Sequence, residues 1–283
     1  MCYNLKGMVN NDKILLIDID SILYYEAHRE KLEWAIEGVH ERMNRIFTET
    51  GTNKYIAFLT GSDCFRYNIA TTRPYKGKRS KDKPKWMYVL RELLKAEYGA
   101  ITLKGLEADD AVAYFSYRNT IICSPDKDVL KQCAGTHYNY QMVPDKDKNG
   151  NKIPGMASSK GFITVSEQDA MRFLYEQMLT GDLTDNIEGI EKVGEVKANA
   201  LIDKWVLGST TSIEKDILGE YIEKYGKVNG LTRFGEMFRL VYMLKTEEDM
   251  LREVGYIPLL PEIQTYESPE ITKSDLDDED PWG

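Results

Sequence analysis

Apolar runs alternate with amphipathic stretches along the first half of this 283-residue chain. The runs are short and rich in Ile and Leu, which predicts buried β-strands. The strands are expected at residues 13–20, 55–60, 100–104, 120–124 and 137–141. The helices are expected at about 28–50 and 84–98, with shorter ones that begin at Glu107 and Asp126. This alternation predicts an α/β fold with a largely parallel central sheet flanked by helices.

The pattern becomes helical in the second half of the chain. Residues 144–160 are polar and contain Gly and Pro, which predicts an exposed loop. Ser166, with Asp169 three residues later, is a variant of the capping box that begins a helix. The expected division is an α/β core over 1–165, a helical part over 166–265 and an acidic tail, of a composition that predicts disorder, over 266–283.

The bulk composition is that of an ordinary globular protein, with 42% hydrophobic and 29% charged residues. No stretch approaches the roughly 20 apolar residues of a membrane span, and the N-terminus has no apolar run typical of a secretory signal. The four cysteines lie far apart, without the spacing of metal ligands. We therefore expect reduced thiols, a cytoplasmic location and no membrane partner.

The net charge of −9 lacks the basic signature of many nucleic-acid-binding domains. The acidity is concentrated, however, because five acidic residues lie in 274–283 and others gather near the ends of predicted strands. A phosphate-bearing substrate is therefore not excluded.

Eight carboxylates stand where predicted strands end or predicted helices begin. They are Asp18, Glu107, Asp109, Asp110, Asp126, Asp128, Asp182 and Asp185. Ligands of open α/β sheets bind outside the carboxyl ends of the strands, so these groups are expected to converge. Divalent cations can neutralise their repulsion, and oxygen-only ligands suit Mg²⁺ or Mn²⁺. Two such ions roughly 4 Å apart are used to cleave phosphodiesters, so the pattern predicts a metal-dependent nuclease.

Each acidic motif also has a simpler interpretation. GLEADD at 105–110 is compatible with helix capping, and SPDKD at 124–128 with a Pro-Asp turn that starts a helix. GDLTDN at 181–186 is compatible with a polar loop after a helix. Asp18 is the stronger signal, because a charge at the end of a buried strand usually marks a site. The occurrence of all four motifs in this order favours the metal interpretation.

Two further segments are candidates for contact with nucleic acid. Residues 73–85 carry seven basic side chains, and within them Tyr75, Lys76, Lys78 and Arg79 combine an aromatic ring with cations that can grip phosphates. Lys76 and Arg79 are suited to stabilising charge on a reacting phosphate. A solvated loop is the simpler alternative for this segment.

Residues 187–202 have the pattern of a helix–hairpin–helix. Gly189 and Gly194 would let backbone N–H groups approach a phosphate, and the following helix N-terminus would add its dipole. Lys192 and Lys197 fit phosphate contacts. A plain turn between two helices is the alternative.

Together these motifs resemble the flap endonuclease and 5′–3′ exonuclease family, which includes bacteriophage replication nucleases and the 5′-nuclease domain of bacterial DNA polymerase I. The resemblance covers roughly residues 13–205 and rests on Asp18, YKGKR at 75–79, the three acidic motifs and the hairpin. It implies a PIN-like nuclease core, a basic arch at about 66–95, and a DNA-binding hairpin in the helical part. The implied substrate is DNA with a 5′ flap, a nick or an RNA primer, cleaved by a monomer.

The resemblance also assigns roles to the candidate residues. Asp18, Glu107, Asp109 and Asp110 would serve a first metal region, and Asp126, Asp128, Asp182 and Asp185 a second. Lys76 and Arg79 would contact the reacting phosphate from the base of the arch, and the catalytic residues would be these two with Asp109 and Asp110. The hairpin from Gly189 to Gly194 would hold the duplex, in the family often with a K⁺ ion.

The chain departs from the family pattern at three places. The first strand ends Asp18-Ile19-Asp20, whereas the family usually has Gly directly after the Asp. Asp20 is therefore an additional acid close to Asp18. The family's acid after the second strand is replaced by Thr60, which leaves Asp63 as a candidate metal ligand. The arch segment is also shorter than in relatives with a closed arch, which favours clamping over threading of the 5′ end.

Two rival functions remain open from the sequence. A PIN-type single-strand ribonuclease shares the sheet and the acidic cluster, and a non-catalytic DNA-binding protein would share the fold. The hairpin and the basic segment weigh against the first, and the eight carboxylates against the second. The acidic tail is a candidate contact for a replication protein. The compact size suggests a stand-alone nuclease, encoded by a phage and acting in the host cytoplasm.

Overall fold

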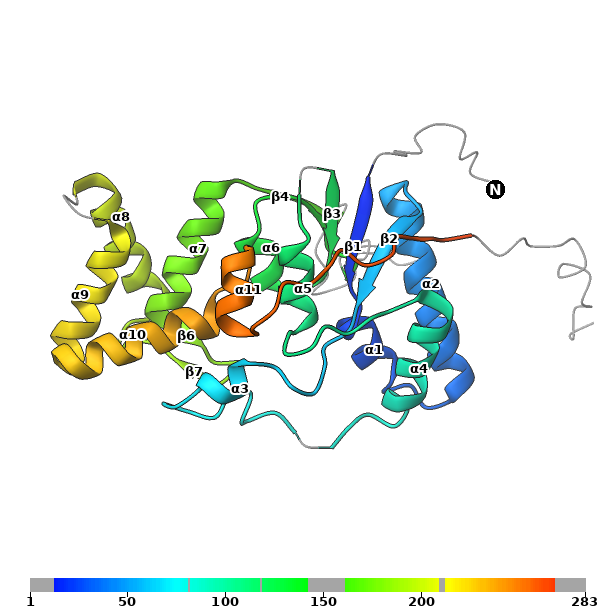
Figure 1. Ribbon diagram of the computed structural model, residues 1–283, viewed down its shortest axis with the longest axis horizontal. Helices are drawn as coiled ribbons and strands as arrows, with labels where there is room; N and C mark the ends of the chain where they lie inside the picture. Colours follow the sequence, from blue (N-terminus) through cyan, green and yellow to red (C-terminus); the bar gives the residue numbers. More distant parts are fainter. Residues whose placement is uncertain (1–12, 81, 118, 142–160, 209–211, 268–283) are drawn as a thin grey trace, which may run out of the picture.

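The structure is a computed structural model, and it describes residues 13–80, 82–117, 119–141, 161–208 and 212–267. A six-stranded sheet in the order β5-β4-β3-β1-β2-β8 lies at its centre (Figure 1). The strands are β1 (Ile14–Asp18), β2 (Lys54–Phe58), β3 (Thr120–Cys123), β4 (Gly135–Tyr138), β5 (Phe162–Val165) and β8 (Gln264–Thr265). The four inner strands are parallel, and the edge strands β5 and β8 are antiparallel to their neighbours. The predicted α/β fold with a largely parallel sheet is confirmed.

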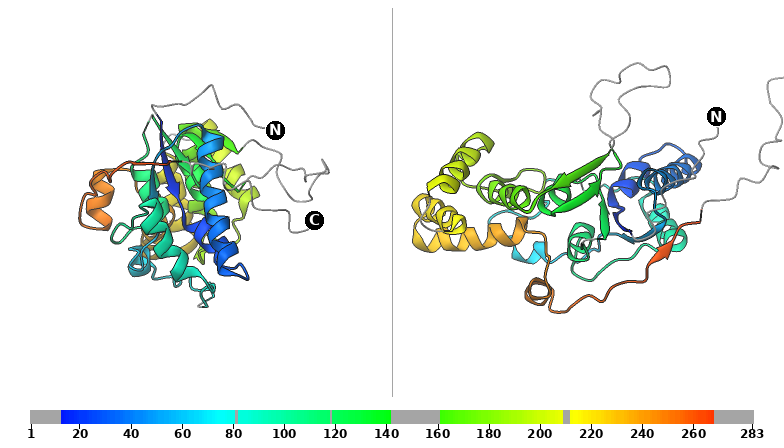
Figure 2. Two further views of the ribbon diagram at one scale, coloured as in Figure 1. Left: turned by 90° about the vertical axis from the view of Figure 1, so that its right-hand side faces the viewer. Right: turned by 90° about the horizontal axis from the view of Figure 1, so that it is seen from above.

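Helices cover both faces of the sheet, which explains why β1 is a continuous apolar run (Figure 2). Side chains alternate along β1, so Leu15 and Ile17 join one core cluster while Ile14 and Leu16 join another. The first cluster packs against α1 (Asp20–Glu26), α2 (Leu32–Thr50) and α4 (Met87–Tyr98). The second cluster packs against α5 (Ala108–Tyr114) and α6 (Lys127–Gln132).

A helical part follows β5, at the end of the molecule away from α1 and α2 (Figure 1). It comprises α7 (Glu167–Thr180), α8 (Glu195–Gly208), α9 (Ile213–Tyr225) and α10 (Lys227–Val241), with the short pair β6 (Gly181–Asp182) and β7 (Ile187–Glu188) after α7. Leu174, Ile202 and Tyr221 belong to its core cluster, which Phe65 and Leu106 of the α/β part also join. The short helices α3 (Arg66–Ile69) and α11 (Glu247–Glu253) connect the two parts.

Most predicted elements are present with shorter bounds, and one predicted strand was wrong. The strand expected at 100–104 is reduced to one bridge between Ile101 and Phe58, because the chain turns away at Gly105, where φ is +77°. The edge strands β5 and β8 were not predicted. Ser166 and Asp169 form the expected capping box. The predicted loop at 144–160 and almost all of the acidic tail lie outside the described residues. Within the described ranges, no helix is long and apolar enough to cross a bilayer.

We expect Leu16→Ala to lower the free energy of unfolding by about 2–5 kcal/mol, because Leu16 is fully buried in the central strand and the substitution leaves a cavity. Chemical denaturation monitored by circular dichroism would measure the change. Val196→Ala on α8 is the control, since Val196 is 87% exposed and its truncation should change stability by less than about 0.5 kcal/mol. Equal effects of the two substitutions would contradict the assignment of β1 to the core.

Candidate functional site

The predicted acidic residues are brought to one edge of the sheet by the strand order. β1 and β3 are parallel neighbours, so Asp18 at the end of β1 lies beside the residues that follow β3. The Ser124 hydroxyl donates a hydrogen bond to the Asp18 carboxylate at 2.9 Å. Burial raises the pKa of Asp18, and the nearby charges of Asp20 and Asp126 raise it further. Burial and the charges of Asp185 and Asp182 likewise raise the pKa of Asp126. The acids that follow β1, β3 and α7 therefore form one continuous acidic region.

Glu107, Asp109 and Asp110 form the most compact part of this region. One carboxylate oxygen from each lies within 4.8 Å of the others, which is close enough to share a metal ion. Glu107 is the N-cap residue of α5, and the two aspartates occupy the first turn of that helix. The start of α5 thus brings the three carboxylates together.

A buried arginine that the sequence analysis missed neutralises Asp110. Arg66 of α3 donates to both oxygens of Asp110, at 2.5 and 2.8 Å. The same guanidinium donates to the carbonyl oxygens of Leu240 and Tyr242 at 2.9 and 3.0 Å. Bidentate pairing of this kind fixes geometry as well as charge. Asp110 therefore ties α5 to α3 and to the end of α10, in addition to its place among the acids.

Asp109 differs from its neighbour because it has no such counter-ion. Among the described residues, no Lys or Arg lies at ion-pair distance from its carboxylate. Burial, followed by the charges of Asp110 and Glu107, raises the pKa of Asp109 well above its ordinary value. Without a cation, the arrangement therefore favours the protonated form of Asp109, and a bound cation would favour its carboxylate.

Raised pKa values are also found among the acids around β1 and α6. Burial, with Asp20 and Asp126 next in effect, raises the pKa of Asp18 to about 8. Burial, with Asp126 and Asp182 next, raises the pKa of Asp128 to about 7. Lys127, 3.9 Å from Asp128, offsets this rise only in part. Oxygen donors that hold protons near neutral pH suit a hard divalent ion, which would displace those protons. The residues present therefore fit a site for divalent metal.

Asp182 and Asp185 are partly neutralised by basic side chains. The Lys127 ammonium lies 3.0 Å from Asp182, and its hydrogen bond and charge outweigh burial and lower the pKa of Asp182. Arg79 donates to Asp185. Lys127 was not predicted as a site residue, although it stands inside the SPDKD motif between the two acids.

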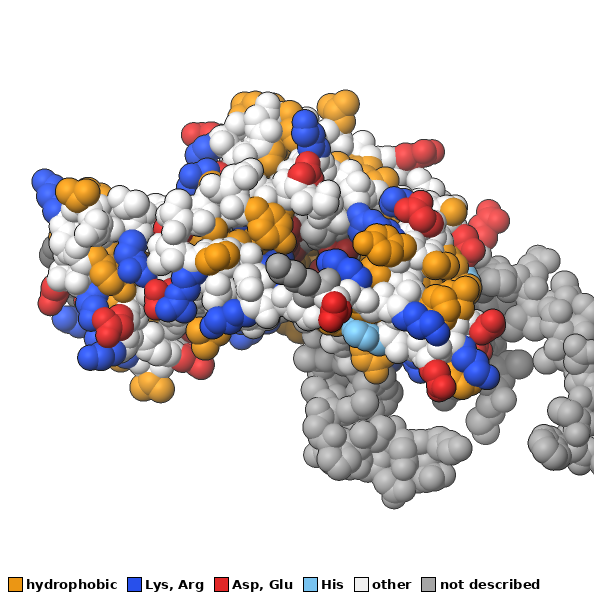
Figure 3. Space-filling view, turned by 90° about the horizontal axis from the view of Figure 1, so that it is seen from below, with side chains coloured by type: hydrophobic (Ala, Val, Ile, Leu, Met, Phe, Trp, Pro, Cys, Tyr) orange, Lys and Arg blue, Asp and Glu red, His pale blue; other side chains and the backbone are white. Residues whose placement is uncertain are grey.

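The basic segment at 71–79, here called the strap, crosses in front of these acids. The Lys76 ammonium forms an ion pair with Glu107 and lies 3.8 Å from Asp185. Lys78 and Arg79 are exposed. Lys and Arg side chains are distributed along the face of the molecule that carries the strap, from the helical part to the α/β part (Figure 3).

Tyr75 has a different role from the one predicted for it. Its ring is only 5% exposed and belongs to the core of the helical part, so it has no free face on which a base could stack. Its hydroxyl is hydrogen-bonded to Glu107 at 2.6 Å and to Asp185 at 2.9 Å. Tyr75 therefore joins acids from the two parts of the chain.

The structure shows how the unusual Asp20 and Thr60 fit together. Both oxygens of Asp20 accept from the Thr60 backbone N–H at 3.1 Å, and the Thr60 hydroxyl accepts from the N–H of Ala108 at 2.9 Å. The carboxylate of Asp20 thus lies just after the end of β2, at the place where the family pattern has an acidic residue in the chain itself. Asp63 is exposed, and within the described ranges it makes no hydrogen bond or ion pair with the acidic region.

The two hairpin glycines are not equivalent. A side chain at Gly189 would overlap the backbone of Leu179 and Thr180, so this glycine serves close packing against α7. Gly194 has open space around it, and the left-handed residue of the turn is Lys192, with φ of 64°. Lys192 and Lys197 are exposed beside Gly194 at the start of α8. The phosphate approach predicted for both glycines is therefore possible at Gly194 alone.

In metal-free protein, we expect stability to fall as pH rises from about 5 to about 8. The raised pKa values of Asp18, about 8, and Asp128, about 7, mean that the folded state binds protons that the unfolded state releases in this window. The melting temperature in EDTA should drop by roughly 5 °C or more, and millimolar Mg²⁺ should restore more stability at pH 8 than at pH 5. Asp18→Asn should flatten the dependence in EDTA. A melting temperature that rises over this range would contradict the assignment.

The chain is similar to known proteins in sequence and in fold. No protein-family model matches it. The chain is 27% identical over 243 residues to DNA polymerase I of Bacillus subtilis (strain 168), a match that covers 77% of this chain and 27% of that protein. It is 27% identical over 210 residues to the 5′-3′ exonuclease of Buchnera aphidicola subsp. Schizaphis graminum, covering 68% of this chain and 70% of the relative. The chain therefore spans about a quarter of the polymerase and most of the exonuclease.

Two solved structures share the fold. The bacteriophage T5 protein crystallised with metal ions has a TM-score of 0.59 at 15% identity, covering 81% of this chain and 89% of that one. The T5 flap endonuclease in a complex with DNA and metal ions has a TM-score of 0.56 at 17% identity, covering 81% and 88%. In sequence the chain is thus similar to a 5′-3′ exonuclease and to part of DNA polymerase I, and it shares the fold of the two T5 structures.

Proposed function

We propose that the chain is a structure-specific 5′ nuclease that hydrolyses phosphodiesters near the 5′ end of a flap, a nick or an RNA primer in DNA replication or repair. The observation that carries this proposal is the meeting of acids from β1, α5, α6 and β6 at one edge of the sheet, directly behind the cationic strap. Such a constellation fits metal-dependent phosphodiester cleavage. The exonuclease relative and the fold shared with a flap endonuclease support the same conclusion.

Two divalent ions, Mg²⁺ or Mn²⁺, would be held by two groups of carboxylates. Asp18, Glu107 and Asp109, with Asp110 behind them, would serve the first ion, and Asp126, Asp128, Asp182 and Asp185 the second. Bound divalent ions lower the pKa of a coordinated water and neutralise phosphate charge. Asp20 is placed to support the first group, because its charge acts on Asp18.

Lys76 and Arg79 would bind the reacting phosphate. Lys76 is paired with Glu107, and Arg79 is paired with Asp185. A metal ion that neutralised those carboxylates would weaken the two ion pairs and leave both cations to face a phosphate. Burial opposes the charged form of Lys76, but the charges of Glu107 and Asp185 raise its pKa, so the ammonium stays protonated.

The hairpin would hold the duplex through its backbone, a mode that reads no sequence. Gly194 lies at the open end of the turn, with Lys192 and Lys197 exposed on either side, and a K⁺ ion could be shared there between backbone and phosphate. A monomer would suffice for this activity. The proposed contact of a replication protein with the acidic tail concerns residues almost all outside the described ranges.

We expect Mg²⁺-dependent cleavage of a 5′-labelled flap near its junction, with Asp109→Asn reducing the rate by about 10²–10³-fold. Asp203→Asn is the matched control, because Asp203 is an exposed carboxylate on α8 paired with Arg172 at 2.7 Å. Its rate should stay within about twofold of the unmodified chain. Preferential cleavage of unpaired RNA would instead indicate a PIN-type ribonuclease, and tight flap binding without cleavage a non-catalytic binder.

Substitution of Gly189 and of Gly194 would distinguish a packing role from a phosphate-binding role. Gly189→Ala should destabilise the protein by about 1–3 kcal/mol, because the new methyl group would overlap the backbone of α7. Gly194→Ala should leave stability within about 0.5 kcal/mol but weaken duplex binding, since its methyl group would point into the space where a phosphate would lie. Thermal melting and fluorescence anisotropy with labelled duplex would measure the two effects. Unchanged duplex affinity in Gly194→Ala would argue against the hairpin as a phosphate site.

A further inference from the structure

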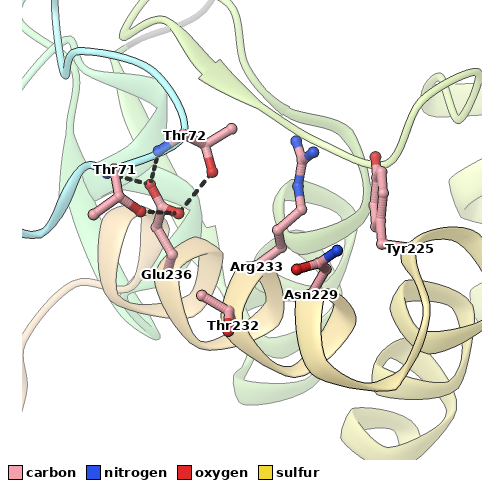
Figure 4. A pocket seen from close by; sticks show the side chains of 7 residues that line it. All are labelled: Thr71, Thr72, Tyr225, Asn229, Thr232, Arg233 and Glu236. Carbon is pink, nitrogen blue, oxygen red and sulfur yellow. Dashed lines mark hydrogen bonds between the residues drawn. The ribbon is translucent and has the colours of Figure 1, made fainter.

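The strap is fastened along its first residues by the helical part, mainly through one carboxylate. Glu236 of α10 accepts four hydrogen bonds from two consecutive threonines (Figure 4). The backbone N–H groups of Thr71 and Thr72 donate at 2.6 and 2.7 Å, and their hydroxyls donate at 2.8 and 2.7 Å. Hydrogen bonds to an ionised acceptor are shorter and stronger than neutral ones.

Polar contacts, rather than burial, hold the strap at this point. Thr71 and Thr72 are exposed, and they border a pocket of about 290 Å³ that also contains Arg233 and Tyr225 (Figure 4). Because little apolar surface is covered here, loss of the carboxylate would leave few other interactions to keep the two threonines against α10.

The residues that follow are anchored to the hairpin side of the helical part. Arg73 lies 2.5 Å from Glu188 of β7, which Arg233 of α10 also contacts at 3.2 Å. The Asn186 amide donates to the Pro74 carbonyl oxygen at 2.9 Å, and the Lys76 N–H donates to that of Asp185 at 2.8 Å. The fastening thus begins at Glu236 and ends at the residue that enters the acidic region.

This series of contacts matters because Lys76 has a backbone conformation that needs support. Its φ of 53° lies in the left-handed region, which costs a residue with a side chain some free energy and persists when neighbouring contacts impose it. The ammonium of Lys76 reaches Glu107 from this conformation. A small displacement of a catalytic group can reduce a rate a hundredfold.

We propose that Glu236 is a positioning residue, which holds the start of the strap on α10 so that Lys76 and Arg79 meet the reacting phosphate. The inference rests on the proposed nuclease function. Glu236 touches neither the acids nor the substrate in this scheme, and acts only through Thr71 and Thr72. A glutamine at this position has one acceptor oxygen instead of two, and its NH₂ group would face N–H or O–H donors.

Glu236→Gln tests the proposal, with Glu248→Gln on exposed surface of α11 as the matched control. Hydrogen exchange of the amides at 71–79 should accelerate about tenfold or more in Glu236→Gln, since the neutral side chain deprives all four hydrogen bonds of their charge assistance. Single-turnover cleavage of a 5′ flap with Mg²⁺ should slow about tenfold. The affinity for flap DNA, measured in Ca²⁺ without turnover, should stay within about twofold, because the hairpin is unchanged.

Variants of the two threonines test whether their hydroxyl groups are needed for the cleavage rate. The double variant Thr71→Val, Thr72→Val removes both hydroxyl donors and should slow cleavage, whereas Thr71→Ser, Thr72→Ser keeps them and should restore the rate. Equal rates in the valine and serine variants, unchanged exchange at 71–79 in Glu236→Gln, or a parallel loss of DNA affinity would each overturn the positioning role. If the unmodified chain cleaved no DNA, the nuclease proposal would fail and this role with it; a cleaving parent with an unaffected variant would overturn the positioning role alone.

Discussion

Repulsion among carboxylates crowded at one edge of the sheet is the constraint on which the rest of this structure depends. Four basic side chains from three segments of the chain oppose it. Arg66 is buried against Asp110, Lys127 pairs with Asp182, and Lys76 and Arg79 come from the strap. Asp18, Asp109 and Asp128 keep raised pKa values in spite of these partners. The protein balances only part of the charge with its own side chains, and the proposed metal ions would balance the remainder.

The same constraint explains why the α/β part and the helical part are joined so closely. The acidic region takes Glu107 from one part and Asp185 from the other, and the Tyr75 hydroxyl bonds to both. Arg66 links Asp110 to backbone carbonyls at the end of α10. These contacts carry charge and position across the boundary, so neither part would present a complete site without the other.

The sequence predicted what depends on local pattern and missed what depends on distant contacts. The parallel sheet followed from apolar runs, and the gathering of Asp18 with Asp126 followed from the rule that strand ends meet at one edge. Arg66 gave no such signal, because its partners Leu240 and Asp110 lie 174 and 44 residues away. The strand expected at 100–104 failed because β-propensity does not show where the chain must turn towards α5. Tyr75 was misread for a similar reason, since an aromatic ring among lysines looks exposed until its packing is known.

The packing of Gly189 on α7 has a consequence for where a strand would be cut. Asp182 and Ile187 are paired in the β6–β7 ladder, and the N–H of Ile190 donates to the carbonyl oxygen of Leu179 at 2.8 Å. The hairpin turn proposed to hold a duplex and Asp182, a proposed metal ligand, are therefore parts of one hydrogen-bonded unit. If the chain acts as proposed, with a backbone phosphate seated at the turn, this unit would fix the distance to the acidic region, and so the number of nucleotides between anchor and cut, equally for every sequence.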